Sequence, residues 1–236
     1  VGGLGDFNST ELTKALAGKK VGTNPYIGKT EEGINGYSTP KDLETLFQLY
    51  YLYFTKLRAD QQAFDSWKTK TAATLANAES QPMTAFQDSL VNVVYNNPLR
   101  MKNLKYADID KVDYARAMKI AAERFSNVAD FTFVVTGNVD EATLTELVCK
   151  YIGSLPSKSK REHYKKIVDF RDGQRTCQFT KQMQDPMVIN YFLYNVPMEY
   201  NLKNDITTDL LGSTLELVLH EEIREKEGGT YGISAY

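Results

Sequence analysis

The fold is indicated most clearly by residues 131–156, FTFVVTGNVDEATLTELVCKYIGSLP. Residues 131–136 form a continuous apolar run, typical of a strand that is buried on both faces. Gly137 ends this run, and Asp140 can cap the helix that follows. The apolar side chains of that helix recur at helical spacing on one face: Leu144, Leu147, Val148 and Tyr151. The stretch therefore predicts a strand, a turn and an amphipathic helix, without the glycine pattern that binds a nucleotide phosphate.

Upstream of this stretch, the pattern predicts a hairpin surrounded by helices. Glycine turns delimit two expected strands, over 19–28 and 31–38. The next helix carries the strongest signals, since Thr39 can cap it and Pro40 occupies its first position. Its apolar face is expected to contain Leu43, Leu46, Phe47, Tyr50, Phe54 and Leu57. Further helices are expected over 8–17, 60–78, 82–95 and 110–125.

Downstream, a basic segment that follows Pro156 predicts a boundary between two α/β units. Residues 157–175 are interpreted as a linker, and their positive charges as those of a solvated tether. Strands are expected over 176–183 and 187–194, followed by a helix that Asn204 or Asp205 can cap. The side chains that this helix is expected to turn inward are Ile206, Leu210, Leu211, Leu215, Val218 and Leu219.

The last residues, 230–236, predict a strand that is only beginning. A domain that ends partway into a strand leaves an unpaired sheet. The sequence is therefore expected to be a piece of a longer polypeptide.

Composition limits the function classes that remain. The 236 residues contain 28 Lys and Arg against 30 Asp and Glu, so the net charge is −2. A chain this close to neutral has no overall positive field to attract nucleic acid. The apolar fraction of 42% is ordinary for a globular protein, and no apolar run approaches the roughly 20 residues that span a bilayer. The sequence indicates a globular chain of mixed α and β structure. Nucleic acid is not expected as a partner, and no membrane-spanning segment is expected in this sequence.

Motifs for metal binding and for nucleophilic catalysis are absent from this sequence. The two histidines, His163 and His220, belong to different segments, and neither is part of H-E-x-x-H or H-x-x-E-H. His220 precedes Glu221 and Glu222 late in a helix, where it is interpreted as a surface residue. No G-x-S-x-G motif is present. The residues of this chain therefore predict no metal site.

One cluster remains as a candidate site, residues 224–232, REKEGGTYG. Arg224 falls on the last turn of the helix, and Tyr231 follows a turn that the paired glycines allow. Arg224 offers a rigid fork of donors for peptide oxygens, and the Tyr231 hydroxyl can donate to an oxyanion. The alternative is structural, with Arg224 complementing the helix dipole and Tyr231 packing.

These residues carry a resemblance to a known family. Arg224-Glu225-Lys226, Gly229 and Tyr231 resemble the R-E-K-x-G-x-x-Y signature of the pitrilysin/insulinase-type zinc peptidases, the M16 family, with one extra residue before the glycines. The passage 133–156 resembles the strand-G-[DN]-helix-[FY]-x-G-x-L-P passage of that family, and 33–39 resemble its hairpin. The similarity extends over almost the whole chain.

The resemblance implies an α+β fold built from two homologous α/β units. Each unit is an antiparallel sheet with helices packed on it, the LuxS/mitochondrial-processing-peptidase-like metallohydrolase fold, here truncated at both ends. Residues 1–156 are expected to be the third such unit of the family, without its N-terminal part. Residues 157–175 are the linker, and 176–236 are the start of the fourth unit.

The resemblance also implies a function, namely a zinc metalloendopeptidase that degrades peptides or unfolded polypeptides in an enclosed chamber. In such enzymes one half holds zinc through H-x-x-E-H and a distant Glu, whose counterpart here falls near Ala73, Thr74 and Leu75. None of these is acidic, and Glu79 lies about one turn too late. The chain is therefore interpreted as the zinc-free second half, inactive as a fragment, with no metal site of its own and with zinc in the other half of the parent enzyme.

Within that interpretation, Arg224 binds the substrate backbone and Tyr231 is both a substrate-binding and a catalytic residue. The expected partners are a peptide substrate and the zinc-bearing N-terminal half of the same protein or a paired subunit. The resemblance suggests the bacterial periplasm or cell envelope as the compartment. Two alternatives stay open: a non-catalytic M16-like structural or partner-binding subunit, and a stand-alone α/β binding module.

Overall fold

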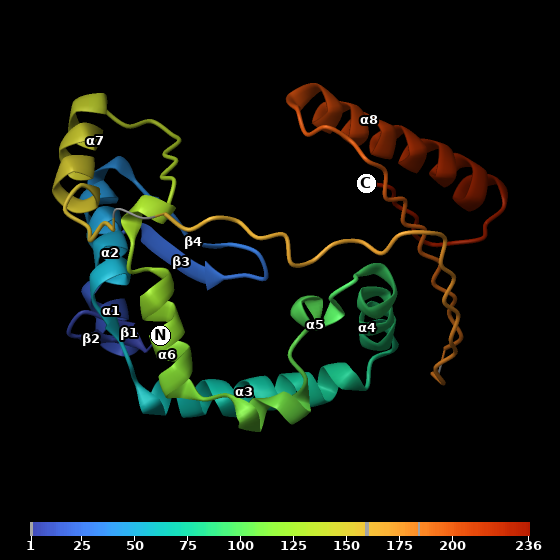
Figure 1. Cartoon of the computed structure of the whole chain (residues 1–236), viewed down its shortest axis with the longest axis horizontal. Coiled ribbons are helices and arrows are strands. Elements are labelled where there is room, and N and C mark those ends of the chain that lie inside the picture. The colour runs from blue at the N-terminus through green and yellow to red at the C-terminus, as the bar shows by residue number, and fades with distance from the viewer. Residues whose placement is uncertain (1, 159–160, 184) are drawn as a thin grey trace. The chain divides into compact units, whose positions relative to one another are not determined.

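A computed structural model describes residues 2–158, 161–183 and 185–236, and it divides the chain into two compact units (Figure 1). The first unit is Val1–Gln184 and the second is Asp185–Tyr236. The linker that the sequence predicts at 157–175 lies within the first compact unit. Compactness does not test homology, so the division into two homologous units stays a prediction.

The first unit opens with two small antiparallel sheets. In one, β1 (Gly3–Leu4) pairs with both β2 (Phe7–Asn8) and β5 (Leu57–Arg58). In the other, β3 (Val21–Ile27) pairs with β4 (Glu32–Ser38) from Val21↔Ser38 to Ile27↔Glu32. The predicted hairpin is therefore confirmed. The sheet of β1, β2 and β5 was not predicted, because strands of two residues carry no periodic pattern.

Most of the first unit is helical, and its predicted helices are confirmed with ends shifted by a few residues. The elements, in chain order, are α1 (Ser9–Ala15), η1 (Pro40–Asp42), α2 (Leu43–Thr55), α3 (Gln61–Glu79), α4 (Pro82–Val94), α5 (Pro98–Met101), η2 (Tyr106–Lys111), α6 (Tyr114–Arg124), η3 (Val128–Asp130), α7 (Glu141–Leu147) and η4 (Val148–Ile152). Among the described residues, every helix is too short or too polar to span a membrane.

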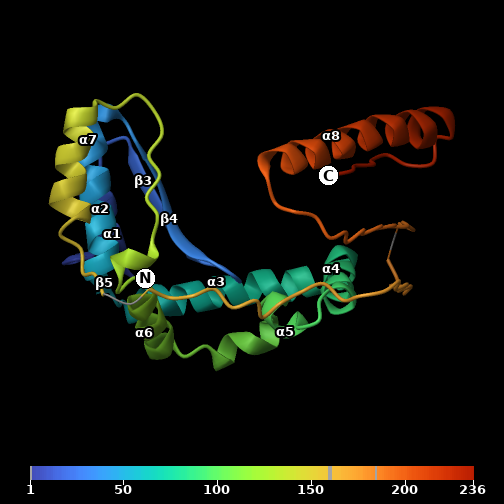
Figure 2. The same ribbon diagram turned by 45° about the horizontal axis from the view of Figure 1, so that its top comes forward.

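Helix α2 is the centre of the core, because it contributes to three buried clusters. Leu43, Leu46 and Phe47 meet Leu147 of α7, and α2 and α7 lie side by side in both views (Figures 1 and 2). The other two clusters join Leu49 and Tyr53 to Leu4, and Phe54 to Phe125 and Leu155. Of the six positions predicted for the apolar face of this helix, four are buried.

The start of this helical segment differs from the prediction in its capping group. The Thr39 side chain makes no capping hydrogen bond and instead donates to Asp42 Oδ2 at 3.0 Å. The same carboxylate oxygen accepts a hydrogen bond from the backbone N–H of Lys20 at 2.9 Å. Buried Asp42 thus ties the helix to the chain that enters β3, and the Lys20 hydrogen bond holds the pKa of this carboxyl below its usual range.

Replacing Asp42 by asparagine is expected to lower the stability of the chain at neutral pH. A carboxyl whose pKa is depressed on folding stabilises the protein above its unfolded pKa, and this contribution disappears as the pH falls through the folded value. The stability difference between wild type and D42N should therefore shrink as the pH falls through the range in which this carboxyl titrates. Urea unfolding at a series of pH values measures it, and a difference that is the same at every pH would contradict the prediction.

The segment 157–175, interpreted as a solvated tether, is hydrogen-bonded to earlier parts of the first unit at two places. At the first, Asn127 Oδ1 accepts from the Lys158 backbone at 2.7 Å, and Asp130 Oδ1 accepts from the Glu162 backbone at 2.9 Å. The Arg124 guanidinium donates both to Glu162 and to Glu32 of β4, and these carboxylates raise its pKa. Of the basic residues of this segment, Lys158, Arg161, Lys165 and Lys166 are exposed, as expected, and Lys160 lies outside the described residues; the backbone at residues 158 and 162 is nevertheless hydrogen-bonded.

At the second place, the segment pairs with the turn after α4. Tyr95 and Phe170 form an antiparallel bridge and stack with ring centroids 5.3 Å apart. Asn96 N–H donates to the Asp169 carbonyl at 2.9 Å, and Asn96 Oδ1 accepts from the Asp169 N–H at 2.8 Å. Residues 161–171 therefore follow a fixed path along the first unit.

The apolar segments 131–136, 176–183 and 187–194 were expected to be strands, and this prediction is wrong for the described structure. None of them pairs with a strand among the described residues. Val134 is 80% exposed, while the rings of Phe131 and Phe133 pack on Phe54. An apolar run reports that a segment can be buried, but a strand also needs a neighbouring backbone to satisfy its N–H and C=O groups.

The second unit is built on one long helix, α8 (Leu202–Leu219), which continues without a break into the π-helical η5 (His220–Lys226). Asn201 caps it by accepting from the Asn204 N–H at 2.9 Å, so the predicted caps Asn204 and Asp205 lie inside the helix. Its expected inner face is largely exposed, since Gly212 is the buried residue of α8. The periodicity predicted the helix correctly, but its apolar side chains find little cover within this unit.

Candidate functional site

The candidate site lies where η5 ends and the chain turns. Gly228 has a φ of 62°, a conformation that favours glycine, and its N–H donates to the Arg224 carbonyl at 3.1 Å. The N–H of Gly229 donates to the Ile223 carbonyl at 3.0 Å. These bonds satisfy the last carbonyls of the helix and confirm the predicted stop at the paired glycines.

Arg224 occupies η5, where its guanidinium is held by two neighbours. Nη1 lies 2.7 Å from His220 Nε2, and Nε lies 3.8 Å from Glu225 Oε1. His220 Nδ1 is 3.7 Å from the same Glu225 oxygen. The Arg224 side chain is 45% exposed, so part of its fork of donors still faces solvent.

Tyr231 lies beyond the turn and is fully exposed. Its neighbours are bound locally, since the Thr230 hydroxyl donates to the Gly232 carbonyl at 2.9 Å. No hydrogen bond or ring contact joins Tyr231 to Arg224 in the part of the chain that the structure describes. Both groups are accessible to a ligand, and their action as a pair stays a prediction.

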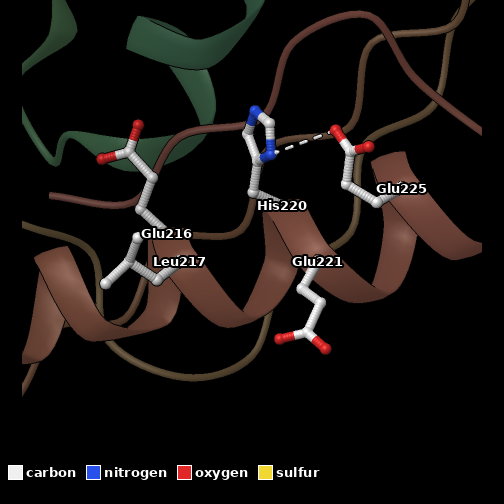
Figure 3. A pocket seen from close by; sticks show the side chains of 5 residues that line it. All are labelled: Glu216, Leu217, His220, Glu221 and Glu225. Atoms are coloured by element: carbon white, nitrogen blue, oxygen red, sulfur yellow. Dashed lines mark ion pairs between the residues drawn. The ribbon is translucent and has the colours of Figure 1, made fainter.

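An open hollow of about 360 Å³ lies along the same helix. It is lined by Glu216, Leu217, His220, Glu221 and Glu225. Figure 3 shows Glu216, His220 and Glu225 pointing to one side of the helix and Glu221 to the other. Lys226 is ion-paired with Glu222 at 2.6 Å and with Glu221 at 3.4 Å. Arg224 is thus the cation nearest to His220 among the contacts described.

The side chains around His220 do not form a zinc site in the part of the chain that the structure describes. Within 2–158, 161–183 and 185–236, no group of three or more His, Cys, Asp or Glu side chains is placed to hold a metal. A cation on His220 Nε2 would meet the Arg224 guanidinium, which already occupies that position. Glu79, the acidic residue closest to the expected position of a distant zinc ligand, accepts from the Tyr106 N–H at 2.8 Å instead.

The sequence analysis interpreted His220 as a surface residue, and its side chain is indeed 38% exposed, but the analysis missed its contact with Arg224. The signal was present, because side chains four residues apart face each other on a helix. Arg224 and Glu225 were recognised in the motif, but their common neighbour was not. The structure adds His220 to the candidate site.

Comparisons with known proteins identify the family of this chain. The family described as the Peptidase M16 inactive domain matches residues 111–236, which include Arg224 and Tyr231. A probable zinc protease PqqL of Escherichia coli is 24% identical, and the match covers 99% of this chain and 25% of the relative. A zinc protease PQQL-like protein of Arabidopsis thaliana is 26% identical over 49% of this chain and 12% of the relative. The chain thus spans about a quarter of the curated relatives that it matches over its whole length.

Solved structures show a similar fold. The periplasmic protease PqqL from Escherichia coli matches with a TM-score of 0.77 and 22% identity, over 98% of this chain and 26% of that one. The ferredoxin protease FusC, solved in complex with Arabidopsis ferredoxin, matches with a TM-score of 0.53 and 12% identity, over 70% of this chain and 18% of that one. Since the family match covers more than half of its residues, the chain belongs to the M16 peptidase family.

Proposed function

We propose that this chain is part of the substrate-binding, zinc-free half of a zinc metalloendopeptidase that degrades peptides or unfolded polypeptides in an enclosed chamber. The observation that carries the proposal is the match of residues 111–236 to a domain described as inactive, in a family whose relatives are named zinc proteases. A second observation supports it: Arg224 and Tyr231 of the family motif are both accessible.

Arg224 would bind the substrate backbone. A guanidinium carries five N–H donors and no acceptor, and its planar fork matches carbonyl and carboxylate oxygens. One N–H of Nη1 faces His220 Nε2, and Nε lies near Glu225, so the other N–H groups of Nη1 and Nη2 are available to a peptide carbonyl. The position at the exposed end of a helix makes this group accessible to an extended polypeptide.

Tyr231 would act on the scissile carbonyl. Its phenol is fully exposed and lies beyond a turn that the hydrogen bonds of Gly228 and Gly229 fix. A hydroxyl that donates to a carbonyl oxygen stabilises the negative charge that develops there during attack. The attacking water would be activated outside this chain, by the zinc and the carboxylate base that the other half of the parent enzyme would supply.

In the full-length protein, Arg224→Ala is expected to raise KM for an unfolded polypeptide roughly ten-fold or more, with a smaller effect on kcat. Hydrogen bonds to charged groups contribute about 1.5–3 kcal/mol, and 1.4 kcal/mol corresponds to about ten-fold. The matched control is Lys226→Ala, which removes a cation from the same turn that is already paired with Glu222. An unchanged KM in R224A would contradict the role of Arg224.

The alternative, a non-catalytic M16-like subunit, makes a different prediction. The full-length protein, together with any paired subunit, would then contain no H-x-x-E-H motif and would release no fragments from an unfolded polypeptide. Sequencing upstream of residue 1 and assaying hydrolysis with added zinc separate the two functions. A zinc-dependent activity that Arg224→Ala weakens favours the protease.

A further inference from the structure

The imidazole of His220 is in contact with the guanidinium of Arg224. Nη1 of Arg224 can only donate, so His220 Nε2, 2.7 Å away, has to accept. The other ring nitrogen of His220 is Nδ1. That nitrogen faces Glu225 Oε1 at 3.7 Å, and the dashed line in Figure 3 marks this pair. One imidazole ring is thus in contact with the Arg224 guanidinium through Nε2 and lies close to the Glu225 carboxylate through Nδ1.

Glu225 is close to both His220 and Arg224. The same Oε1 atom lies 3.8 Å from Arg224 Nε, so one carboxylate is close to both the imidazole and the guanidinium. The two contacts act on different nitrogens of Arg224, one on Nη1 and one on Nε. A long side chain at the end of a helix is thereby restrained at two points, although it remains 45% exposed.

We propose that His220 is a positioning residue, which holds the Arg224 guanidinium ready to bind a substrate carbonyl. The inference rests on the proposed function of Arg224. A free arginine side chain loses rotamer freedom when it binds a ligand, whereas a restrained one has lost much of it beforehand and binds more tightly. His220 touches no substrate in this role and acts through Arg224 alone.

The test measures KM and kcat of the full-length protein with fluorescein-labelled β-casein as the unfolded polypeptide. His220→Ala is expected to raise KM about three- to ten-fold, the range of one neutral hydrogen-bond acceptor, and to leave kcat within about two-fold. His220→Gln should restore most of the loss, since its amide oxygen can accept from the guanidinium. Glu222→Ala is the matched control, since Glu222 lies in the same helical segment outside the hollow, pairs with Lys226 and should leave KM unchanged.

A double-mutant cycle decides whether His220 acts through Arg224. In the Arg224→Ala background, His220→Ala should produce no further change in KM. If the two effects add instead, or if Gln restores nothing, the positioning role is wrong. If Arg224→Ala raises KM but His220→Ala does not, the inference fails while the proposed function stands. If Arg224→Ala has no effect, both fail.

Circular dichroism and thermal unfolding of each variant verify that it is folded. Should His220→Ala fail to fold, His220→Met replaces it, because methionine is a good helix former of similar size with only a weak acceptor. The comparison of H220M with H220Q then carries the test. Equal KM values for these two variants would overturn the role of His220 as an acceptor.

Discussion

Tyr231→Phe is expected to lower kcat of the full-length protease by about 10²–10³-fold, the usual effect of removing one oxyanion donor. The hydroxyl would donate to the scissile carbonyl only as negative charge develops on it, so KM should change little. Folding should be intact, because the Tyr231 side chain is fully exposed and its hydroxyl is not part of the core. Steady-state hydrolysis of labelled β-casein measures both constants.

The matched control is Tyr236→Phe. Tyr236 lies five residues further along the chain, is 91% exposed and is outside the family motif. Turnover of Y236F should equal that of the wild type. If Y231F and Y236F hydrolyse the substrate equally well, Tyr231 has no part in the chemistry, and the proposed function would then rest on Arg224 alone.

Phe54→Ala is expected to cost about 3–5 kcal/mol of folding free energy, the range for truncating a buried phenylalanine. Phe54 is 8% exposed and packs edge-on against two other rings. The centroid distances are 5.6 Å to Phe125 and 4.9 Å to Phe131, with interplanar angles of 90° and 79°. Truncation would leave a cavity between α2 and the residues that follow α6, and would remove favourable edge-to-face contacts. Urea unfolding of the chain measures the loss.

Tyr164→Ala serves as the control for this prediction. Tyr164 is 77% exposed in the anchored segment after α7, so its truncation should change stability by less than about 0.5 kcal/mol. A loss of less than about 1 kcal/mol in F54A would contradict the placement of Phe54 in the core. A large loss in Y164A would instead show that the anchored segment contributes to the stability of the first unit.

The elements that could be predicted are those with local signals. Pro40 and the apolar spacing after it predicted α2, and the paired glycines predicted the end of η5. The hairpin of β3 and β4 followed from its glycine turns. Each of these signals lies within a few residues of the structure that it specifies. Of the candidate site, Arg224 and Tyr231 were identified through the motif, whereas the contact of His220 with Arg224 was not predicted.

The remaining features depend on partners that are distant in the sequence. Arg124 donates to Glu32 across 92 positions, and Asp130 accepts from the backbone of Glu162 across 32. No pattern near Glu162 indicates that its segment is anchored. Residues 131–136 show the reverse case, in which a strong local pattern for a buried strand finds no strand to pair with in the described structure.

The sequence by itself determined the helices, the hairpin, the turn at Gly228 and the membership in the M16 family. These follow from capping, periodicity and motif spacing, which act between residues close in the chain. The tertiary structure decided which apolar faces are covered, how α2 divides among three clusters, and where the segment after α7 is fixed. It decided them because burial and hydrogen bonding require a second group at the right distance in space, and the sequence does not state that distance.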